Sequence, residues 1–404
     1  MTHPLPRSSG TTVLVALLVV GLLGVHVLLA SPGGDLSHHY TDHLRHMAEA
    51  QALVERGFAI YRLPYGEAAR GLFPCAEHEG LFPERTAPYP PLGVLLHWPL
   101  GALERAGYLQ PSMAHRWMAL LWLAVGLAAG VLGLVLLRPH GRWALAGGVL
   151  LLVPLLVGSG ANGFYDVAYV LAGTAALLAL VRGRPGTAVV LLGVCAAVHF
   201  RALVFAPVGL WALLAAWRAG RGRALVSGAV AVVLVLTAAA SAAALSGTLE
   251  TIPADNPVHF SHLLRGKPSP LLFVLLALAS SGYLLRDHYP WAALTVLSGA
   301  LVALMDRSHG YWHALPLVVP ALVLAAERPS PAPSAPRLWW VAWGWSLAAA
   351  VLAFRYQLTP YWQWLADVVR GRVVCRWEGA ALVDSSTESD CACSLSLWER
   401  AGGE

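Results

Sequence analysis

The strongest constraint on this chain is a series of apolar runs, each close to the length that crosses a lipid bilayer. A helix needs about 20 mostly apolar residues to span the hydrocarbon core. Eleven segments approach this requirement: residues 11–30, 113–137, 143–158, 164–181, 187–200, 202–217, 224–246, 270–285, 290–305, 313–326 and 338–354. Backbone polar groups inside a bilayer must be satisfied within the protein, so we expect these segments to be α-helices.

The composition supports this interpretation. Hydrophobic residues make up 57% of the 404-residue chain and charged residues only 12%, whereas soluble domains average about 25% charged residues. The net charge of +5 is spread along the chain, so it does not indicate a nucleic-acid partner. We therefore predict an all-α polytopic membrane protein whose main surroundings are a lipid bilayer.

The basic residues set the orientation of the predicted spans. With the N-terminus in the cytoplasm, the short loops on that side hold eleven basic residues: Arg7, Arg138, Arg142, Arg182, Arg184, Arg218, Arg221, Arg223, Arg286, Arg328 and Arg337. The short loops on the other side hold four: Arg201, Arg265, Lys267 and Arg307. Cytoplasmic loops carry an excess of Lys and Arg. We therefore expect an inside N-terminus, a transmembrane domain over residues 1–356 with a large extracytoplasmic loop at 31–112, and an extracytoplasmic tail at 357–404.

Residues 11–30 also have features of a secretory signal peptide. Leu28 occupies the third position before Ser31, where a cleavage site needs a small residue, so we favour an uncleaved anchor. Four of the five cysteines then lie on the outer side: Cys75, Cys375, Cys391 and Cys393. Disulfides can form there, and the sequence leaves a disulfide-linked tail and free thiols as alternatives.

Two segments interrupt the simple pattern of spans. Residues 92–103 are apolar but too short to cross the bilayer, so we expect a helix lying in the interface. One continuous helix over 187–217 would move the basic RAGRGR stretch to the outer side, so we predict a break near His199, Phe200 and Arg201. Such a break needs protein or a water-filled cavity around it. The sequence leaves open whether the break lines a cavity or forms a wet outer turn.

The long first loop holds the densest set of chemically active side chains. Residues 40–55 have helical character but are too polar to span, so we expect them on the membrane surface. His39, Asp42, His43 and His46 share one face of this helix by their spacing. Asp42 could be a catalytic carboxylate with the histidines binding substrate, the four could bind a divalent metal, or the face could simply be solvated. The HExxH spacing of zinc proteases does not occur here.

Further polar groups lie near the outer ends of the predicted spans: Asn162, Asp166, His199, Arg201, Arg265, Lys267, Asp306, Arg307, His309, Tyr311 and His313. Ionisable groups at or inside membrane segments are costly and functional by default. A carboxylate beside a ring of cations suits a substrate that carries a phosphate next to a membrane. Arg201 is the hardest to explain as an interfacial anchor, because apolar runs flank it on both sides.

Four features follow one another along the chain. The first loop opens with an acidic residue and an Ala-rich helix, in TDHLRHMAEAQALVERGFAIYRLP. A YPPL motif at residues 89–92 precedes the apolar interfacial segment. Arg201, followed by Pro207, lies at the outer end of a short span, and GYWHALPLVVPAL is a His/Tyr-rich approach to a Leu/Pro-rich span. This ordered set resembles the GT-C superfamily of integral-membrane glycosyltransferases, and most closely its polyprenyl-phosphate-mannose-dependent branch.

The resemblance covers roughly residues 10–355 and has departures. Arg201 stands where the family more usually has Lys, and His43 and His46 stand where aromatic residues are expected. The acidic pair expected early in the loop is unclear, because Asp35 and Asp42 are seven positions apart. Asp42 fits the helix pattern better and Asp35 is the second choice.

The resemblance implies an inverting hexosyltransferase, mannosyltransferase-like, with its active site on the extracytoplasmic side of the cytoplasmic membrane. The donor would be a polyprenyl-phosphate-linked sugar and the acceptor a hydroxyl of a glycan, lipid or protein. Asp42 or Asp35 would act as the base. Basic and aromatic residues would bind the substrates: His46, Tyr89, His199, Arg201, Arg265, Lys267, Arg307, His309, Tyr311 and His313. The resemblance names no definite cofactor, and a divalent metal stays open.

Other functions also suit a polar outer surface. A transporter or flippase of lipid-linked sugars should show internal repeats with paired broken helices, and we find no clear repeat. A metal-binding membrane protein would use the face of His39, Asp42, His43 and His46. A structural membrane subunit would leave the charged groups incidental.

Overall fold

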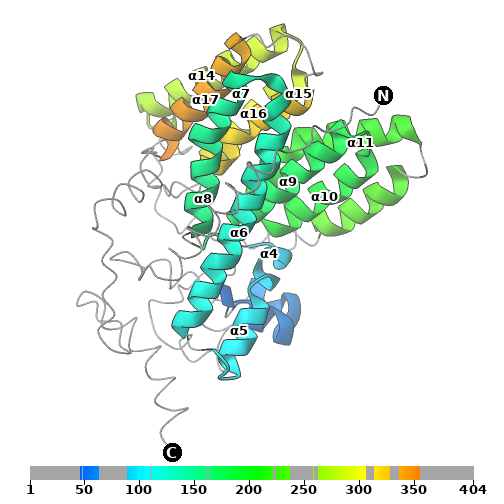
Figure 1. The fold of residues 1–404 in the computed structure, drawn as a ribbon, viewed down its shortest axis with the longest axis vertical. Helices are drawn as coiled ribbons and strands as arrows, with labels where there is room; N and C mark the ends of the chain where they lie inside the picture. The colour runs from blue at the N-terminus through cyan, green and yellow to red at the C-terminus, as the bar shows by residue number, and fades with distance from the viewer. Residues whose placement is uncertain are drawn as a thin grey trace, which may run out of the picture.

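The computed structural model describes residues 46–62, 89–236, 258, 263–305, 314–327 and 336–354, except positions 48, 110, 162, 221 and 223. Within these ranges the chain is helical and has no strand, which confirms the all-α prediction (Figure 1). Four helical stretches there are long and apolar enough to cross a membrane: Trp117–His140, Arg142–Gly160, Phe200–Ala219 and Pro268–Arg286. These stretches point to a membrane protein.

Shorter apolar helices coincide with five more predicted spans: Asp166–Val181, Pro185–Val198, Ala224–Leu236, Pro290–Met305 and Leu315–Glu327. The helix α17 (Pro336–Phe354) matches the last one. The count of eleven spans and their sidedness stay predictions, and the segment at residues 11–30 lies outside the described residues. So do Cys75 and the tail at 357–404.

The long helices follow one another along the chain. The first are α6 (Pro111–Leu137), α7 (Arg142–Gly147), α8 (Val153–Ala161), α9 (Asp166–Val181) and α10 (Pro185–Val198). A π-helical segment, Gly148–Leu152, joins α7 to α8. The 3₁₀ helix η5 (Phe200–Phe205) and α11 (Ala206–Ala219) follow, and later come α14 (Pro268–Arg286), α15 (Pro290–Met305) and α16 (Leu315–Glu327).

Proline sets the start of many of these helices, because its missing N–H costs nothing in the first turn and its fixed φ suits a helix. Pro185, Pro207 and Pro268 lie in the first two positions of α10, α11 and α14. The helices pack around a core of fully buried side chains such as Trp122 and Tyr169.

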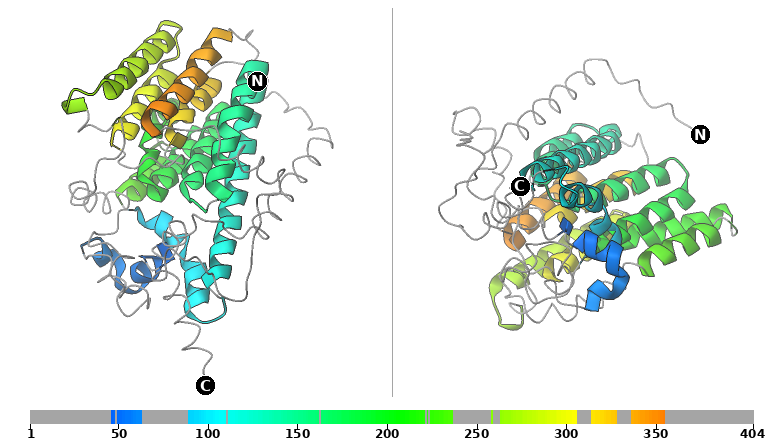
Figure 2. Two further views of the ribbon diagram at one scale, coloured as in Figure 1. Left: turned by 90° about the vertical axis from the view of Figure 1, so that its left-hand side faces the viewer. Right: turned by 90° about the horizontal axis from the view of Figure 1, so that it is seen from below.

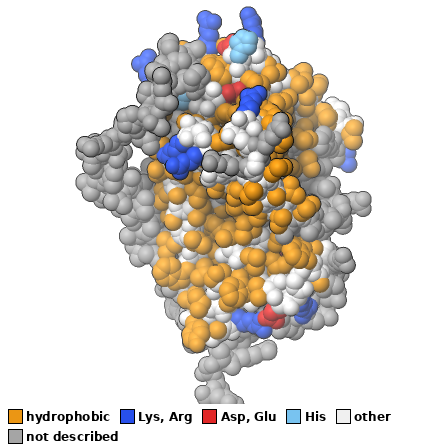
Figure 3. Space-filling view, turned by 90° about the vertical axis from the view of Figure 1, so that its right-hand side faces the viewer, with side chains coloured by type: hydrophobic (Ala, Val, Ile, Leu, Met, Phe, Trp, Pro, Cys, Tyr) orange, Lys and Arg blue, Asp and Glu red, His pale blue; other side chains and the backbone are white. Residues whose placement is uncertain are grey.

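Much of the surface of the described helices is apolar. Hydrophobic side chains form a continuous band across the middle of the face in Figure 3, and charged side chains gather toward both ends. Leu271, Leu275 and Leu278 of α14 are each more than half exposed. Such an apolar surface is compatible with contact with a bilayer.

The first loop folds against one end of the helices. Residues 46–47 and 49–56 are helical, as expected, and the 3₁₀ helix η1 (Gly57–Arg62) follows. The expected single helix at 92–103 is instead two, α4 (Pro91–Leu95) and α5 (Trp98–Arg105), because Pro99 starts a new helix. Figure 2 shows these segments together beside the beginning of α6.

Candidate functional site

The predicted break between α10 and α11 is present and is centred on His199. This residue is extended, with φ −152° and ψ 140°, between the end of α10 at Val198 and the start of η5 at Phe200. Its ring Nδ1 accepts a hydrogen bond from the Arg201 backbone N–H at 3.0 Å, which satisfies a donor left over at the start of a helix. His199 is 0% and Arg201 5% exposed. The break is therefore packed by protein, and the alternative of a wet turn is wrong.

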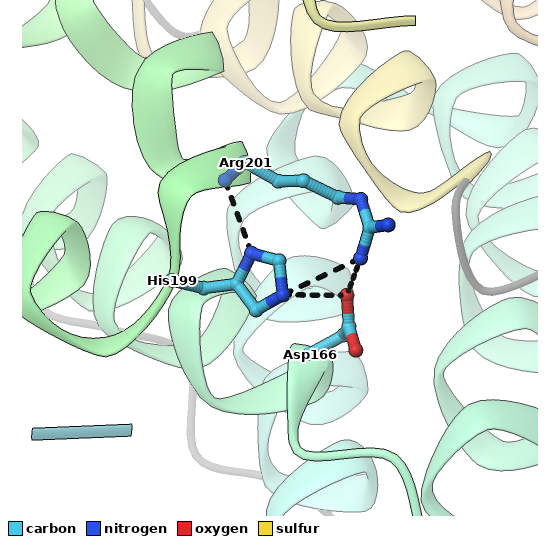
Figure 4. A network of polar contacts seen from close by, with 3 residues as sticks. All are labelled: Asp166, His199 and Arg201. Atoms are coloured by element: carbon cyan, nitrogen blue, oxygen red, sulfur yellow. Dashed lines mark hydrogen bonds and ion pairs between the residues drawn. The ribbon is translucent and has the colours of Figure 1, made fainter. Parts of the chain in front are cut away.

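An ion pair fixes the Arg201 side chain at this break (Figure 4). Its Nη1 donates to Oδ1 of Asp166 at 2.5 Å, and His199 Nε2 lies 3.4 Å from the same oxygen. Asp166 begins α9, where a carboxylate also interacts favourably with the helix dipole. Since His199 Nδ1 accepts a hydrogen bond, a neutral His199 carries its proton on Nε2 and can donate it to Asp166.

The Tyr165 ring links this ion pair to the first loop. Its centroid lies 5.2 Å from that of His46, 5.3 Å from that of His97 and 5.3 Å from that of His199. Tyr89 contacts the same ring at 5.6 Å. First-loop residues and residues of the apolar helices therefore form one group, which is buried except for the half-buried Tyr89. We call it the polar cluster and define it as His46, Glu49, Tyr89, His97, Tyr165, Asp166, His199 and Arg201.

One contact packs the first loop against the helices, and a second closes the loop on itself. Gly93 of α4 packs so closely that a Cβ there would lie 2.1 Å from the carbonyl oxygen of Val198, so only glycine permits this approach. The Tyr61 hydroxyl donates to the Tyr89 carbonyl oxygen at 2.9 Å. Burial, with a smaller effect from the charge of Glu49, raises the pKa of Tyr61 well above its ordinary value, so the phenol stays a donor.

The structure brings together four of the residues predicted for the site: His46, Tyr89, His199 and Arg201. Arg265 and Lys267 precede α14 and are exposed, with no contact that joins them to the polar cluster among the described residues. The remaining predicted residues lie outside the described part of the chain: Asp35, His39, Asp42, His43, Arg307, His309, Tyr311 and His313.

The metal alternative gains no support from the described residues, among which no group of three or more His, Cys, Asp or Glu could hold an ion. His46 Nδ1 instead lies 3.2 Å from Oε2 of the buried Glu49. Three members of the predicted metal-binding face are outside the described ranges.

Sequence reasoning left Glu49, His97 and Tyr165 out of the site and gave Asp166 no role. Two of these had a readable signal. Glu49 lies three positions after His46 on a helix, so it shares that face. His97 is an ionisable residue inside an apolar run, which marks functional candidates near membranes. The pairing of Asp166 with Arg201 joins residues 35 positions apart and had no local signal.

Comparisons with family models, with curated proteins and with solved structures found no match for this chain. The chemistry of the polar cluster is therefore the guide to function. It offers an oriented guanidinium, two buried carboxylates and several His and Tyr rings, all where a loop meets apolar helices.

Proposed function

We propose that this protein is an inverting glycosyltransferase that moves a mannose-like sugar from a polyprenyl-phosphate donor to an acceptor hydroxyl of a glycan, lipid or protein. The reaction would take place at the extracytoplasmic side of the cytoplasmic membrane. The observation that carries the proposal is the buried Arg201, fixed by Asp166 at the helix break and adjoining the first loop. The family resemblance of the first loop supplies the reaction type.

Arg201 suits the leaving group of this reaction, which is a lipid phosphate. A guanidinium has five N–H donors in a rigid planar fork that matches phosphate oxygens. Held by Asp166, it needs little reorganisation to stabilise the charge that develops on the phosphate. A cation at this position therefore acts most strongly in the transition state.

The acceptor side of the reaction needs a base. The acceptor oxygen attacks the anomeric carbon as the bond from that carbon to the phosphate oxygen breaks, and the electron pair leaves with the polyprenyl phosphate. The acceptor proton would pass to the Asp42 carboxylate, with Asp35 as the second choice. Asp42 precedes His46 by four positions in the sequence. A positioned base contributes about 10²–10⁴-fold.

The test is sugar transfer in membranes that contain the protein and a labelled polyprenyl-phosphate-mannose. We expect Asp42→Asn to lower transfer at least about 100-fold and Arg201→Gln to lower it about 10²–10³-fold. Arg201→Lys should retain part of the activity because it keeps the charge. Arg218→Gln, at an exposed arginine of α11, is the matched control and should be unaffected.

A transporter of lipid-linked sugars is the second candidate, because the break between α10 and α11 is the kind of discontinuous helix that transporters use. The same membranes distinguish the two. Movement of the labelled lipid between leaflets, with its sugar intact and no product, would replace the glycosyltransferase proposal by transport. Transfer that survives in Asp42→Asn would move the role of base to Asp35.

A further inference from the structure

Next to the ion pair of Arg201, the polar cluster contains buried polar atoms with no hydrogen-bond partner. Within the described part of the chain these include His97 Nε2, Glu49 Oε1 and the Tyr165 hydroxyl. The three side chains are almost fully buried, with exposures of 0% for His97, 3% for Glu49 and 3% for Tyr165. Buried polar groups in proteins are nearly always hydrogen-bonded, so three such atoms in one cluster require an explanation.

The three atoms belong to one neighbourhood, because His46 connects their side chains. Its Nδ1 lies 3.2 Å from Glu49 Oε2, and its ring centroid lies 4.9 Å from that of His97. The rings of His97 and Tyr165 are themselves in edge-to-face contact at 5.3 Å. The three unpartnered atoms therefore belong to side chains that all adjoin His46.

The hydrogen bond of His97 to the backbone fixes its tautomer. Its Nδ1 lies 3.1 Å from the Gly93 carbonyl oxygen, which can only accept, so Nδ1 carries the proton. Burial, and then the nearby His46, hold the pKa of His97 well below its ordinary value, so the ring stays neutral. Its Nε2 is consequently a bare acceptor. The low pKa also makes His97 a poor general base, which favours a binding role.

The set of atoms selects the chemistry of the ligand. His97 Nε2 and Glu49 Oε1 both accept hydrogen bonds, so the ligand must supply at least two donors, and the charge of Glu49 disfavours an anion there. The Tyr165 hydroxyl can donate or accept. The rings of Tyr165, Tyr89 and His97 add flat apolar surface that suits the C–H face of a sugar ring. Neighbouring hydroxyl groups on a hexose meet all these requirements.

We infer that His97 and Glu49 bind two hydroxyl groups of a hexose, so that the polar cluster has a sugar-binding half beside the phosphate-binding half at Arg201. This inference rests on the proposed function, since it places the sugar next to the cation that would hold its phosphate. It makes His97 a specificity-determining residue rather than the base of the reaction.

The experiment measures binding of methyl α-mannoside to the full chain in lipid nanodiscs by saturation-transfer NMR, in the absence of donor lipid. We expect His97→Phe, which keeps a ring of similar shape, to weaken binding about tenfold. His97→Gln should restore most of the affinity, because its amide oxygen can accept in place of Nε2. His140→Phe is the control, since His140 is also buried and contacts Trp339 at 5.7 Å, as His97 contacts Trp122 at 5.5 Å.

A series of monodeoxy mannosides tests the hydroxyl contacts without relying on any variant. One analogue should bind about tenfold more weakly than the parent to the wild type but equally to His97→Phe. Equal binding of all analogues by the wild type, or no binding of the parent, would overturn the inference. Sugar transfer with an unchanged KM in His97→Phe would overturn it while leaving the proposed function standing. Specific sugar binding without any sugar transfer would support the sugar-binding role of His97 and overturn the proposed glycosyltransferase function.

Discussion

Arg201 and the arginines at the helix ends have the same side chain in opposite surroundings. Arg201 is buried at the break and paired with Asp166. The described arginines that the charge pattern assigns to the cytoplasm are all exposed: Arg138, Arg142, Arg182, Arg184, Arg218, Arg286 and Arg337. The predicted orientation of the spans would account for the exposed group. It does not account for Arg201, whose desolvation costs several kcal/mol unless partners offset it.

The comparison distinguishes charges that would set the orientation of a membrane protein from a charge that belongs to its candidate functional site. In the predicted topology the exposed arginines would act through their number and their side of the membrane, so any one of them should be replaceable. A buried arginine acts through its partners, so removing Arg201 leaves the buried Asp166 carboxylate without its ion-pair partner. Each of the following predictions compares a residue of the polar cluster or the first loop with a less constrained counterpart of the same type.

The largest effect is expected for Arg201→Met, which leaves the Asp166 carboxylate buried without its guanidinium. Breaking a buried pair from one side costs about 3–5 kcal/mol, so unfolding in detergent micelles should begin at clearly lower denaturant. Arg218→Met should leave the unfolding curve unchanged. The double variant Asp166→Leu/Arg201→Met should recover most of the lost stability but no sugar transfer. A single variant as stable as the wild type would contradict the ion pair.

The second prediction compares Glu104 with Glu55. Burial raises the pKa of Glu104 in α5 to about 8 from an ordinary 4.5, so the folded protein binds this proton more tightly than the unfolded chain. The resulting stability is complete below about pH 4.5 and is lost progressively as the pH rises from there through about 8, by on the order of 5 kcal/mol. Unfolding measured from pH 5 to 9 should show this decline in the wild type and in Glu55→Gln. Glu104→Gln should reduce the decline.

Glu55 is the appropriate control because it is exposed and its carboxylate pairs with Arg105 of α5. Exposed ion pairs contribute little, so its removal should shift the curve without changing the slope. Should Glu104→Gln keep the full decline with pH, another group would have to bind the proton.

The third prediction compares two glycines. Gly93→Ala places a methyl group 2.1 Å from the Val198 carbonyl oxygen and 2.8 Å from Cε2 of Tyr165, so α4 must move away from the helix break. Overpacking of this kind typically costs about 1–3 kcal/mol. Gly209→Ala in α11 meets no atom within 4 Å and should be neutral or stabilising. Crosslinking between cysteines introduced in α4 and α10 would show whether the contact opens. Equal behaviour of the two variants would mean that α4 is not packed on the break.

The sequence predicted the parts of this molecule that depend on local patterns. Hydropathy gave the positions of the described long helices, and the charge pattern gave the break at His199, because a continuous helix would have misplaced a basic stretch. Tyr89 and His46 were found through motif and helical spacing in the first loop. Each of these signals lies within a few residues of the feature that it predicts.

Long-range contacts were beyond the sequence. Nothing near Asp166 identifies Arg201 as its partner, since the pair forms only when α9 packs against the break. The split of residues 92–103, by contrast, had a local signal that the sequence analysis did not use, because Pro99 suits the first turn of a new helix. His97 lies at this split, where its ring bonds to the Gly93 carbonyl oxygen and contacts the Trp122 ring of α6. The contact with Trp122 could not be predicted from the sequence near His97.

The smallest effect is expected for the hydroxyl that ties η1 to the YPPL segment. Tyr61→Phe removes the hydrogen bond to the Tyr89 carbonyl oxygen and should cost about 0.5–1.5 kcal/mol. Tyr108→Phe, at a side chain that is 79% exposed, should cost nothing measurable. Because the lost bond closes the first loop, hydrogen exchange at residues 57–62 should quicken before global unfolding changes. Equal exchange in the two variants would show that ring packing alone closes the loop, and the polar cluster would then need no directed contact from η1.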